Sequence, residues 1–233
     1  NSKFMVQNCL SKIKTFGIKN LADNNGKILE IDFSGMLLKI NNKEFWTPLV
    51  GKFNASNLLA VFSVANIAGI KSIEILRILS QTKGINGRFE ILKTPNNAFV
   101  IVDYAHTPNS LQNVIDTISQ IRTKNEVFIT IIGCGGNRDL GKRSKMGEIV
   151  LNGCDKVIFT SDNPRYEKPE KIINDMLFGI NPNNMKKISK IVNRKEAIEN
   201  GCSQLNSGDI LLVVGKGHET YQEIKGVKIP FND

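Results

Sequence analysis

The segment Ser161-Asp162-Asn163-Pro164-Arg165 has the residue types and spacing that best suit recognition of an anion. Pro164 fixes its own φ and biases Asn163 away from the helical region, so we expect a stiff turn. A guanidinium fork on a stiff turn suits bidentate binding of a carboxylate or a phosphate, and the amide of Asn163 adds a donor beside it. The alternative is a strand-to-helix loop with a solvated arginine.

Three other polar segments that contain glycine or proline also follow apolar runs, at residues 103–108, 133–143 and 215–221. Ligands bind outside the carboxyl ends of the strands in open parallel sheets. Four such segments at one edge of a sheet would therefore form a ligand site. Their candidate side chains are those of His106, Arg138, Arg143, Lys216, His218 and Glu219.

Residues 136–143 have the G-x-x-x-x-G-K spacing of a phosphate-binding loop. The next residue should be Ser or Thr, whose hydroxyl binds Mg²⁺, but the sequence has Arg143 there and Ser144 one position later. A phosphotransferase built on this loop is disfavoured, and it would predict tight Mg-ATP binding by this chain alone. A glycine loop that binds an anion at the start of a helix remains open.

The elements that must position these segments alternate from residue 91 onwards. Continuous apolar runs predict strands buried on both faces, and helical patterns fall between them. This alternation predicts a doubly wound α/β domain with a mostly parallel sheet. We expect strands near residues 99–102, 127–132, 156–160, 187–192 and 210–214, and helices near residues 108–122, 143–151, 169–178 and 194–205.

The first part of the chain has a different pattern. Strands are expected over residues 27–33 and 36–40, with a hairpin-type break at Ser34 and Gly35. A helix over residues 58–70 is apolar nearly all round, which predicts burial. A second helix, over residues 72–82, would be capped by Ser72. We place a domain boundary between residues 87 and 88.

Composition narrows the function classes. The 233 residues are 41% hydrophobic and 23% charged, which is ordinary for a soluble globular protein. The net charge of +9 suits an anionic ligand, but no basic stripe with interleaved aromatic residues suggests nucleic acid. No apolar run is long enough to cross a bilayer, and no leader is evident, so we expect a cytoplasmic protein. The four cysteines are scattered, which indicates neither zinc nor a disulfide framework.

Seven motifs together resemble the Mur ligases, in order and in spacing, over residues 51–233. They are GKFNASN, GRFE, DYAHTP, GCGGNRDLGKR, TSDNPR, GKGHETYQ and PFND. The resemblance implies that residues 1–87 are the tail of the ATP-binding central domain and residues 88–233 the C-terminal, amino-acid-binding domain. The UDP-binding domain, the true phosphate loop and a carbamylated lysine that assists Mg²⁺ binding would precede Asn1.

The resemblance also implies site residues, and it points to the members of the family that add meso-diaminopimelate. Contacts to meso-diaminopimelate would fall on Arg138, Asp162, Asn163, Pro164, Arg165, Gly215 and Glu219. Contacts on the ATP side would fall on Asn54, Asn57, Arg88, Asp103 and His106, of which Asp103 and His106 would be catalytic; no metal ligand is expected. Structural alternatives are a helix cap for Asn54 or Asn57, a linker charge for Arg88, turn formation for Asp103 and His106, and a surface position for Glu219.

The implied reaction is ATP-dependent amide formation through an acyl phosphate, with UDP-MurNAc-L-Ala-D-Glu, ATP and meso-diaminopimelate as partners and a monomeric protein. Closure would hinge near Gly87 and Arg88. Lysine lacks the far carboxylate of meso-diaminopimelate, so lysine would leave Arg165 unpaired at a cost of about 2–5 kcal/mol. The alternative from another class is a non-catalytic module that binds an amino acid or a nucleotide.

Overall fold

The computed structural model describes residues 6–18 and 21–233. The chain divides into two compact units, Asn1–Lys83 and Gly84–Asp233. The boundary expected from the sequence, after residue 87, lies four residues further along the chain.

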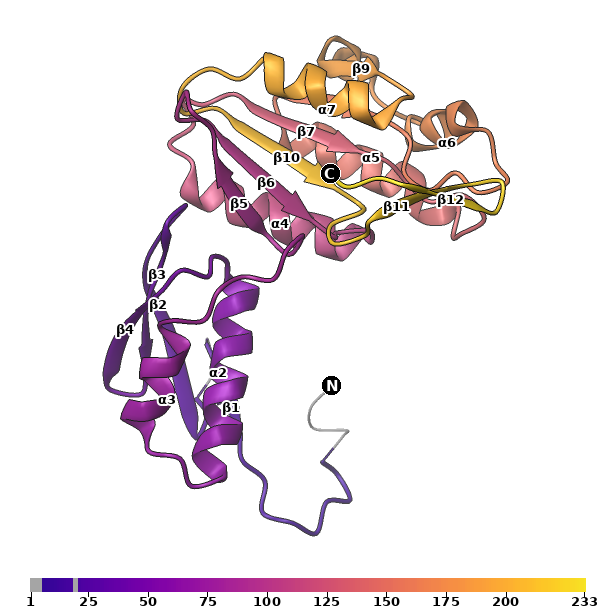
Figure 1. Cartoon of the computed structure of the whole chain (residues 1–233). Helices are drawn as coiled ribbons and strands as arrows, with labels where there is room; N and C mark the ends of the chain where they lie inside the picture. Colours follow the sequence, from indigo (N-terminus) through magenta and orange to yellow (C-terminus); the bar gives the residue numbers. More distant parts are fainter. Residues whose placement is uncertain (1–5, 19–20) are drawn as a thin grey trace. The chain divides into compact units, whose positions relative to one another are not determined.

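The first unit packs two helices on a four-stranded sheet whose strand order is β1-β2-β3-β4 (Figure 1). Strands β2, β3 and β4 pair antiparallel, and the predicted turn between β2 and β3 is confirmed. Asp32 Oδ1 accepts hydrogen bonds from the backbone N–H groups of Ser34 and Gly35 and closes this turn. The elements are β1 (Phe16–Gly17), β2 (Asn24–Asp32), β3 (Gly35–Ile40), β4 (Lys43–Thr47), α2 (Lys52–Ile67) and α3 (Ser72–Leu79).

Two predictions for the helices of the first unit are wrong. Helix α2 is not buried all round, because Val61, Val64 and Ile67 are exposed along one side and only the opposite side packs on the sheet. Helix α3 has Lys71, not Ser72, at its N-cap position. The sequence does not mark these three positions as exposed, since Val61, Val64 and Ile67 are as apolar as the buried residues of the helix.

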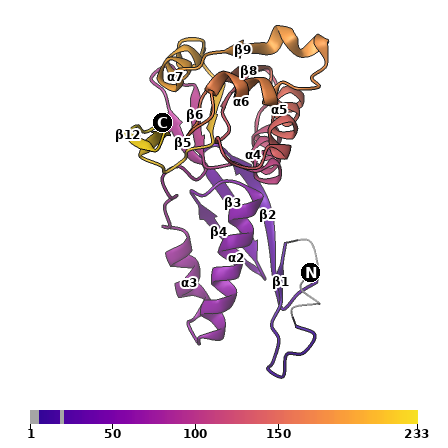
Figure 2. The same ribbon diagram turned by 90° about the vertical axis from the view of Figure 1, so that its right-hand side faces the viewer.

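The second unit is a doubly wound α/β domain, as predicted. Its six-stranded sheet has the order β5-β6-β10-β7-β8-β9, and only β5 runs antiparallel to its neighbour. Helices α4, α5 and α6 cover one face of the sheet, and α7 covers the other (Figure 2). The helices are α4 (Pro108–Ile121), α5 (Gly141–Gly153), α6 (Pro169–Met176) and α7 (Arg194–Ser203).

The strands of this sheet are continuous apolar runs, and every residue of β7 and β10 is buried. The strand predicted over residues 187–192 is shorter, because a 3₁₀ helix, η1 (Pro182–Lys187), takes up its start. A two-stranded hairpin near the end of the chain was not predicted. The strands are β5 (Glu90–Lys93), β6 (Phe99–Asp103), β7 (Phe128–Ile132), β8 (Lys156–Phe159), β9 (Ile188–Lys190), β10 (Ile210–Val214), β11 (Tyr221–Ile224) and β12 (Val227–Pro230).

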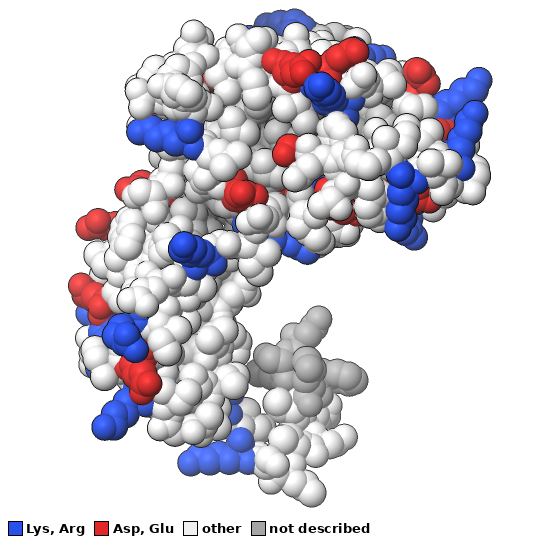
Figure 3. All heavy atoms as spheres, in the orientation of Figure 1, with Lys and Arg blue, Asp and Glu red and all other residues white. Residues whose placement is uncertain are grey.

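The charges are dispersed on the face of the protein shown in Figure 3, where Lys and Arg are interspersed with Asp and Glu.

The side chains of two arginines, Arg143 and Arg194, are fully buried. Arg194 on α7 binds the carboxylate of Asp233, with Nε donating to Oδ1 at 2.6 Å, and its Nη2 donates to the carbonyl of Val214. No helix among the described residues combines the length and the apolar composition that crossing a membrane requires.

Two of the four free cysteines are buried, and this gives a test of the fold. Burial raises the pKa of the Cys134 and Cys154 thiols to about 12, so roughly one molecule in ten thousand carries either thiolate at pH 8. Cys9 and Cys202 are exposed. Iodoacetamide at pH 8 should therefore label Cys9 and Cys202 in the folded protein, and all four after unfolding, as read by peptide mass spectrometry. Rapid labelling of Cys134 or Cys154 in the folded protein would contradict this packing.

Candidate functional site

The four polar segments singled out in the sequence follow β6, β7, β8 and β10. These strands are neighbours in the sheet and run parallel, so the segments meet at one edge. The expectation that they converge is confirmed. The hairpin β11–β12 lies beside them, because residues 162–165 form hydrogen bonds with residues of β11.

The turn that carries Arg165 is held by the hairpin as well as by Pro164. The Arg165 N–H donates to the carbonyl of Glu223 at 3.0 Å, and the Arg165 carbonyl accepts from Lys225 N at 2.7 Å. Arg165 has φ +50°, a left-handed conformation that a non-glycine residue keeps only where its surroundings hold it. The hairpin therefore supplies rigidity that the proline alone was expected to give.

The Arg165 side chain is neither solvated nor free. Its Nε donates to Glu223 Oε2 at 3.1 Å, and its Nη1 donates to the carbonyl of Gly136 at 2.9 Å. Only 19% of the side chain is exposed. A guanidinium has five N–H donors, so within the described residues these two bonds leave three for a ligand.

Asn163 is buried and links three segments. Its Oδ1 accepts from Lys216 Nζ at 3.0 Å and from Glu223 N at 2.8 Å, and its Nδ2 donates to Glu219 Oε2 at 2.8 Å. The expectation that the Asn163 amide is a ready donor beside Arg165 needs correction. One of its two amide protons already belongs to Glu219, so Asn163 orders the site more than it offers donors.

Lys216 provides a fully buried ammonium at the base of this network. Its Nζ lies 3.2 Å from Glu219 Oε2 and 3.7 Å from Asp162 Oδ1. Burial raises the pKa of Asp162, and the charges of Arg194 and Lys216 oppose that rise. Gly215 has φ +116°, and a Cβ there would lie 2.7 Å from Asp162 Oδ2. Two carboxyl groups thus share one ammonium, which leaves acceptor capacity for a positively charged ligand group.

Lys216 was a candidate side chain of the ligand site, but the sequence predicted no specific role for it. A lysine between two glycines directly after a buried strand is the signal that could have found it. Glu223 and Gln222, whose Nε2 donates to the carbonyl of Asp162, were missed altogether. They lie on the hairpin that the sequence did not predict.

The phosphotransferase interpretation of residues 136–143, already disfavoured by the sequence, gains no support from the structure, because several backbone N–H groups of this segment are bonded within the protein. Gly136 N donates to Asn163 O at 2.9 Å, Asn137 N to Glu167, and Gly141 N to Asp139. A Cβ on Gly136 would lie 2.0 Å from the carbonyl of Pro164, so the loop packs against the Arg165 turn instead of cradling a phosphate.

The two arginines of residues 133–143 differ in burial and in their partners. Arg143 is fully buried and paired with Glu167 and Asp175, so its role is structural. Arg138 is exposed. A Cβ on Gly135 would lie 3.0 Å from Arg165 Nη1 and 3.6 Å from Arg138 Cγ, so the structure brings Arg138 and Arg165 to the same glycine.

Residues expected on the ATP side of the second unit gather around Tyr104. Arg88 lies over its ring at 4.4 Å, and the rings of His106 and His218 lie 4.6 and 4.8 Å from it. His218 was among the candidate side chains of the ligand site, but Tyr104 was not, although an aromatic residue between an aspartate and a histidine was a usable signal. Together they present two imidazoles and a guanidinium.

Asp103 fixes the backbone on both sides of this cluster. Its carboxylate accepts hydrogen bonds from Phe89 N at 2.8 Å and Ala105 N at 2.7 Å, so it does form the turn. Burial raises the pKa of Asp103, although these N–H donors and Arg88 oppose the rise. The Nδ1 of His106 lies 2.9 Å from the carbonyl of Tyr104, which fixes the orientation of the ring.

Asn54 and Asn57 belong to the first unit, in the first turns of α2. Neither caps the helix, because Gly51 occupies the N-cap position and the Asn54 Nδ2 donates back to the Val50 carbonyl at 2.8 Å. The helix-cap interpretation of both residues is therefore wrong, and Asn57 is exposed.

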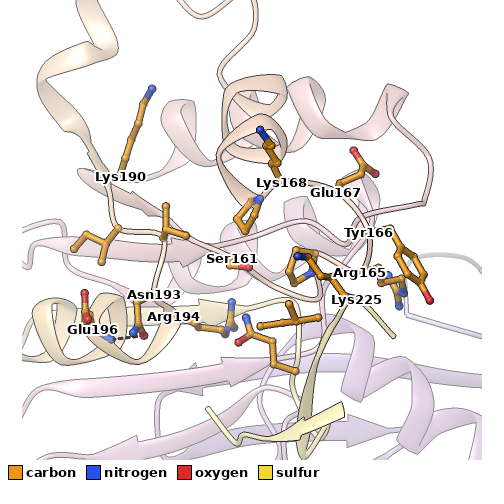
Figure 4. Close-up of a pocket in the computed structure, with 16 residues that line it drawn as sticks. Ser161, Arg165, Tyr166, Glu167, Lys168, Lys190, Asn193, Arg194, Glu196 and Lys225 are labelled. Atoms are coloured by element: carbon orange, nitrogen blue, oxygen red, sulfur yellow. Dashed lines mark hydrogen bonds between the residues drawn. The ribbon is translucent and has the colours of Figure 1, made fainter. Parts of the chain in front are cut away.

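A cavity of about 860 Å³ opens on the side of the Arg165 turn that faces α7 (Figure 4). Its charged lining includes Lys168, Lys190 and Lys225, which come from three different segments. Of the residues predicted to bind substrate, only Pro164 and Arg165 line it. Arg165 thus lies between this cavity and the side that carries Arg138 and Glu219.

Within residues 6–18 and 21–233, no group of three or more His, Cys, Asp or Glu side chains could hold a metal ion.

Comparison with known proteins identifies the family. A family model described as "Mur ligase, glutamate ligase domain" matches residues 87–217, which is more than half of the chain. The chain belongs to the Mur ligase family. The match covers the sheet and all four polar segments up to residue 217.

Related proteins extend this similarity to the whole chain. A protein of Phocaeicola vulgatus named UDP-N-acetylmuramoyl-L-alanyl-D-glutamate--2,6-diaminopimelate ligase is 48% identical over 233 residues, which are 100% of this chain and 48% of that protein. One of Bacteroides thetaiotaomicron with the same name gives the same values. A solved structure with this name is 36% identical, with a TM-score of 0.66 over 99% of this chain and 48% of that one. The chain thus spans about half the length of the relatives it matches.

The buried ammonium of this Mur ligase chain gives a prediction about stability. Lys216→Met leaves Asp162 and Glu219 without their shared cation, and removing one partner of a buried ion pair costs about 3–5 kcal/mol. Urea unfolding should show that Lys216→Met lowers the free energy of unfolding by this amount. Lys195→Met, at an exposed position, should change the free energy of unfolding little.

The pH dependence of the same variant follows from Asp162. Without Lys216 its folded-state pKa, already raised above 3.8 by burial, rises further. The folded protein then binds this proton more tightly than the unfolded chain, so the stability deficit should shrink as the pH falls from 8 towards 5. A deficit that is absent, or that grows at low pH, would contradict the arrangement.

Proposed function

We propose that this chain is the C-terminal half of an ATP-dependent ligase that adds meso-diaminopimelate to UDP-MurNAc-L-Ala-D-Glu in the cytoplasm. The names and the identity of the relatives support the reaction, and the coverage supports the assignment to half of a longer protein. In this proposal the first unit is the tail of the ATP-binding central domain and the second is the amino-acid-binding domain. The hinge near residues 87 and 88 stays a prediction.

The observation that carries the proposal is the pairing of opposite charges at the Arg165 turn. Meso-diaminopimelate has two ends, each with an ammonium and a carboxylate, and only one end reacts. The other end matches what the turn offers: three donors of Arg165 and the nearby Arg138 for the carboxylate, and the surplus acceptors of Glu219 and Asp162 for the ammonium. Asn163, two residues before Arg165, holds Glu219 and Lys216 in place through hydrogen bonds.

The cluster around Tyr104 would serve the nucleotide. Transfer of a phosphoryl group to the terminal carboxylate of the UDP-linked substrate gives an acyl phosphate, and the free amine of the amino acid displaces phosphate from it. This chemistry depends on positioning and on stabilising charge rather than on a covalent nucleophile. Arg88 supplies the permanent positive charge of the cluster. Asp103 and His106 shape the loop that carries Tyr104. Mg²⁺ would neutralise phosphate charge from ligands elsewhere in the longer protein.

Arg165→Ala in the full-length protein should lower kcat/KM for meso-diaminopimelate roughly 10- to 150-fold, the equivalent of about 1.5–3 kcal/mol for hydrogen bonds to a charged group. This is less than the sequence suggested, because Glu223 and Gly136 keep Arg165 paired when lysine binds. Any activity with lysine should change little.

Steady-state kinetics with both amino acids measure this effect, with Lys195→Ala as a control for the loss of an exposed positive charge. Unchanged use of meso-diaminopimelate by Arg165→Ala would remove Arg165 from the amino-acid pocket.

Arg88→Ala in the full-length protein should raise KM for ATP and leave KM for meso-diaminopimelate nearly unchanged. The reason is that Arg88 lies over Tyr104, in the segment that follows β6, whereas Asn163 is in the segment that follows β8. Initial rates with each substrate varied in turn decide the point. A rise confined to KM for meso-diaminopimelate would show that the two sides are assigned in reverse.

A further inference from the structure

Glu223 forms three hydrogen bonds with the turn that carries Arg165. Its backbone N–H donates to Asn163 Oδ1 at 2.8 Å, and its carbonyl accepts from Arg165 N at 3.0 Å. Its side-chain Oε2 accepts from Arg165 Nε at 3.1 Å, and 22% of the side chain is exposed. One residue of β11 thus fixes both the backbone and the guanidinium of Arg165.

We propose that Glu223 is the resident counter-ion of Arg165, and that the carboxylate of the incoming amino acid must share the guanidinium with it. Glu223 would then set both the affinity for an amino acid with a far carboxylate and the discrimination against one without it. This inference rests on the proposed function, in which Arg165 binds that carboxylate.

The anchoring of Glu223 keeps its carboxylate beside Arg165. Both backbone groups of Glu223 are bonded to the turn, so the hairpin cannot withdraw while those bonds last. Gly136 O holds Nη1 on another side of the guanidinium. The guanidinium therefore has one orientation before the ligand arrives, which lowers the ordering cost of binding.

The same arrangement has an electrostatic consequence. A ligand carboxylate on the three remaining donors lies across one guanidinium from Glu223, and the two negative charges repel each other in a partly buried place. Lysine brings no carboxylate to this position, and it leaves Arg165 paired as before. Glu223 thus weakens binding of the dicarboxylate ligand selectively and narrows the difference between the two ligands.

Glu223→Gln in the full-length protein separates charge from geometry, because glutamine keeps the side-chain acceptor and the backbone bonds. Isothermal titration calorimetry should show Kd for meso-diaminopimelate falling roughly three- to thirtyfold, with Kd for L-lysine unchanged within about twofold. Glu199→Gln makes the same change of net charge at an exposed position of α7 and should alter neither Kd. If Glu223→Gln does not fold, as judged by thermal unfolding, Glu223→Met removes the same charge and should act in the same direction.

Unchanged or weaker binding of meso-diaminopimelate by the folded variant would overturn the counter-ion role, and so would an equal change for both ligands. Arg165→Ala separates this failure from failure of the proposed function. If Arg165→Ala leaves binding of meso-diaminopimelate intact, the assignment of Arg165 fails and this inference fails with it. If Arg165→Ala weakens binding but Glu223→Gln does not tighten it, only the counter-ion role fails.

Discussion

The buried amide of Asn163 is the interaction on which the rest of the site depends. It accepts from Lys216 and from the backbone of Glu223, and it donates to Glu219. Burying such groups is costly unless each finds a partner, so the segments after β8 and β10 and the hairpin must converge in one arrangement. The position of Arg165, the acceptor surplus around Lys216 and the place of Glu223 all follow from that convergence.

The cations of the second unit have different uses that the net charge does not reveal. Arg143 and Arg194 form buried ion pairs within the protein. Arg143 joins α5 to Glu167, just before α6, and to Asp175 in α6, and Arg194 joins α7 to Asp233. Lys216 is consumed inside the site. Arg88, Arg138 and Arg165 keep donors for a ligand, and they divide between the Tyr104 cluster and the Arg165 turn. A zwitterionic amino acid suits the turn because charges of both signs remain available there.

Much of the second unit could be predicted from the sequence, because its strands are continuous apolar runs and its polar segments directly follow them. Local pattern could not predict which face of α2 is exposed, since Val61 and Val64 are as apolar as the residues beneath them. The hairpin was not predicted either, because residues 221–230 mix apolar with polar side chains and are largely exposed. Missing the hairpin meant missing Glu223, and hence the partner that keeps Arg165 from being an open fork. Partner choice among charged residues is decided by tertiary distance, as the contrast between Arg138 and Arg143 shows.

The most direct test is a crystal structure of the full-length protein with meso-diaminopimelate bound. We expect one ligand carboxylate within about 2.7–2.9 Å of the free N–H groups of Arg165, with Glu223 still bonded to Nε and the adjacent ligand ammonium bonded to Glu219. A ligand whose carboxylates are both held by other residues, while Arg165 keeps only Glu223 and Gly136, would contradict this arrangement.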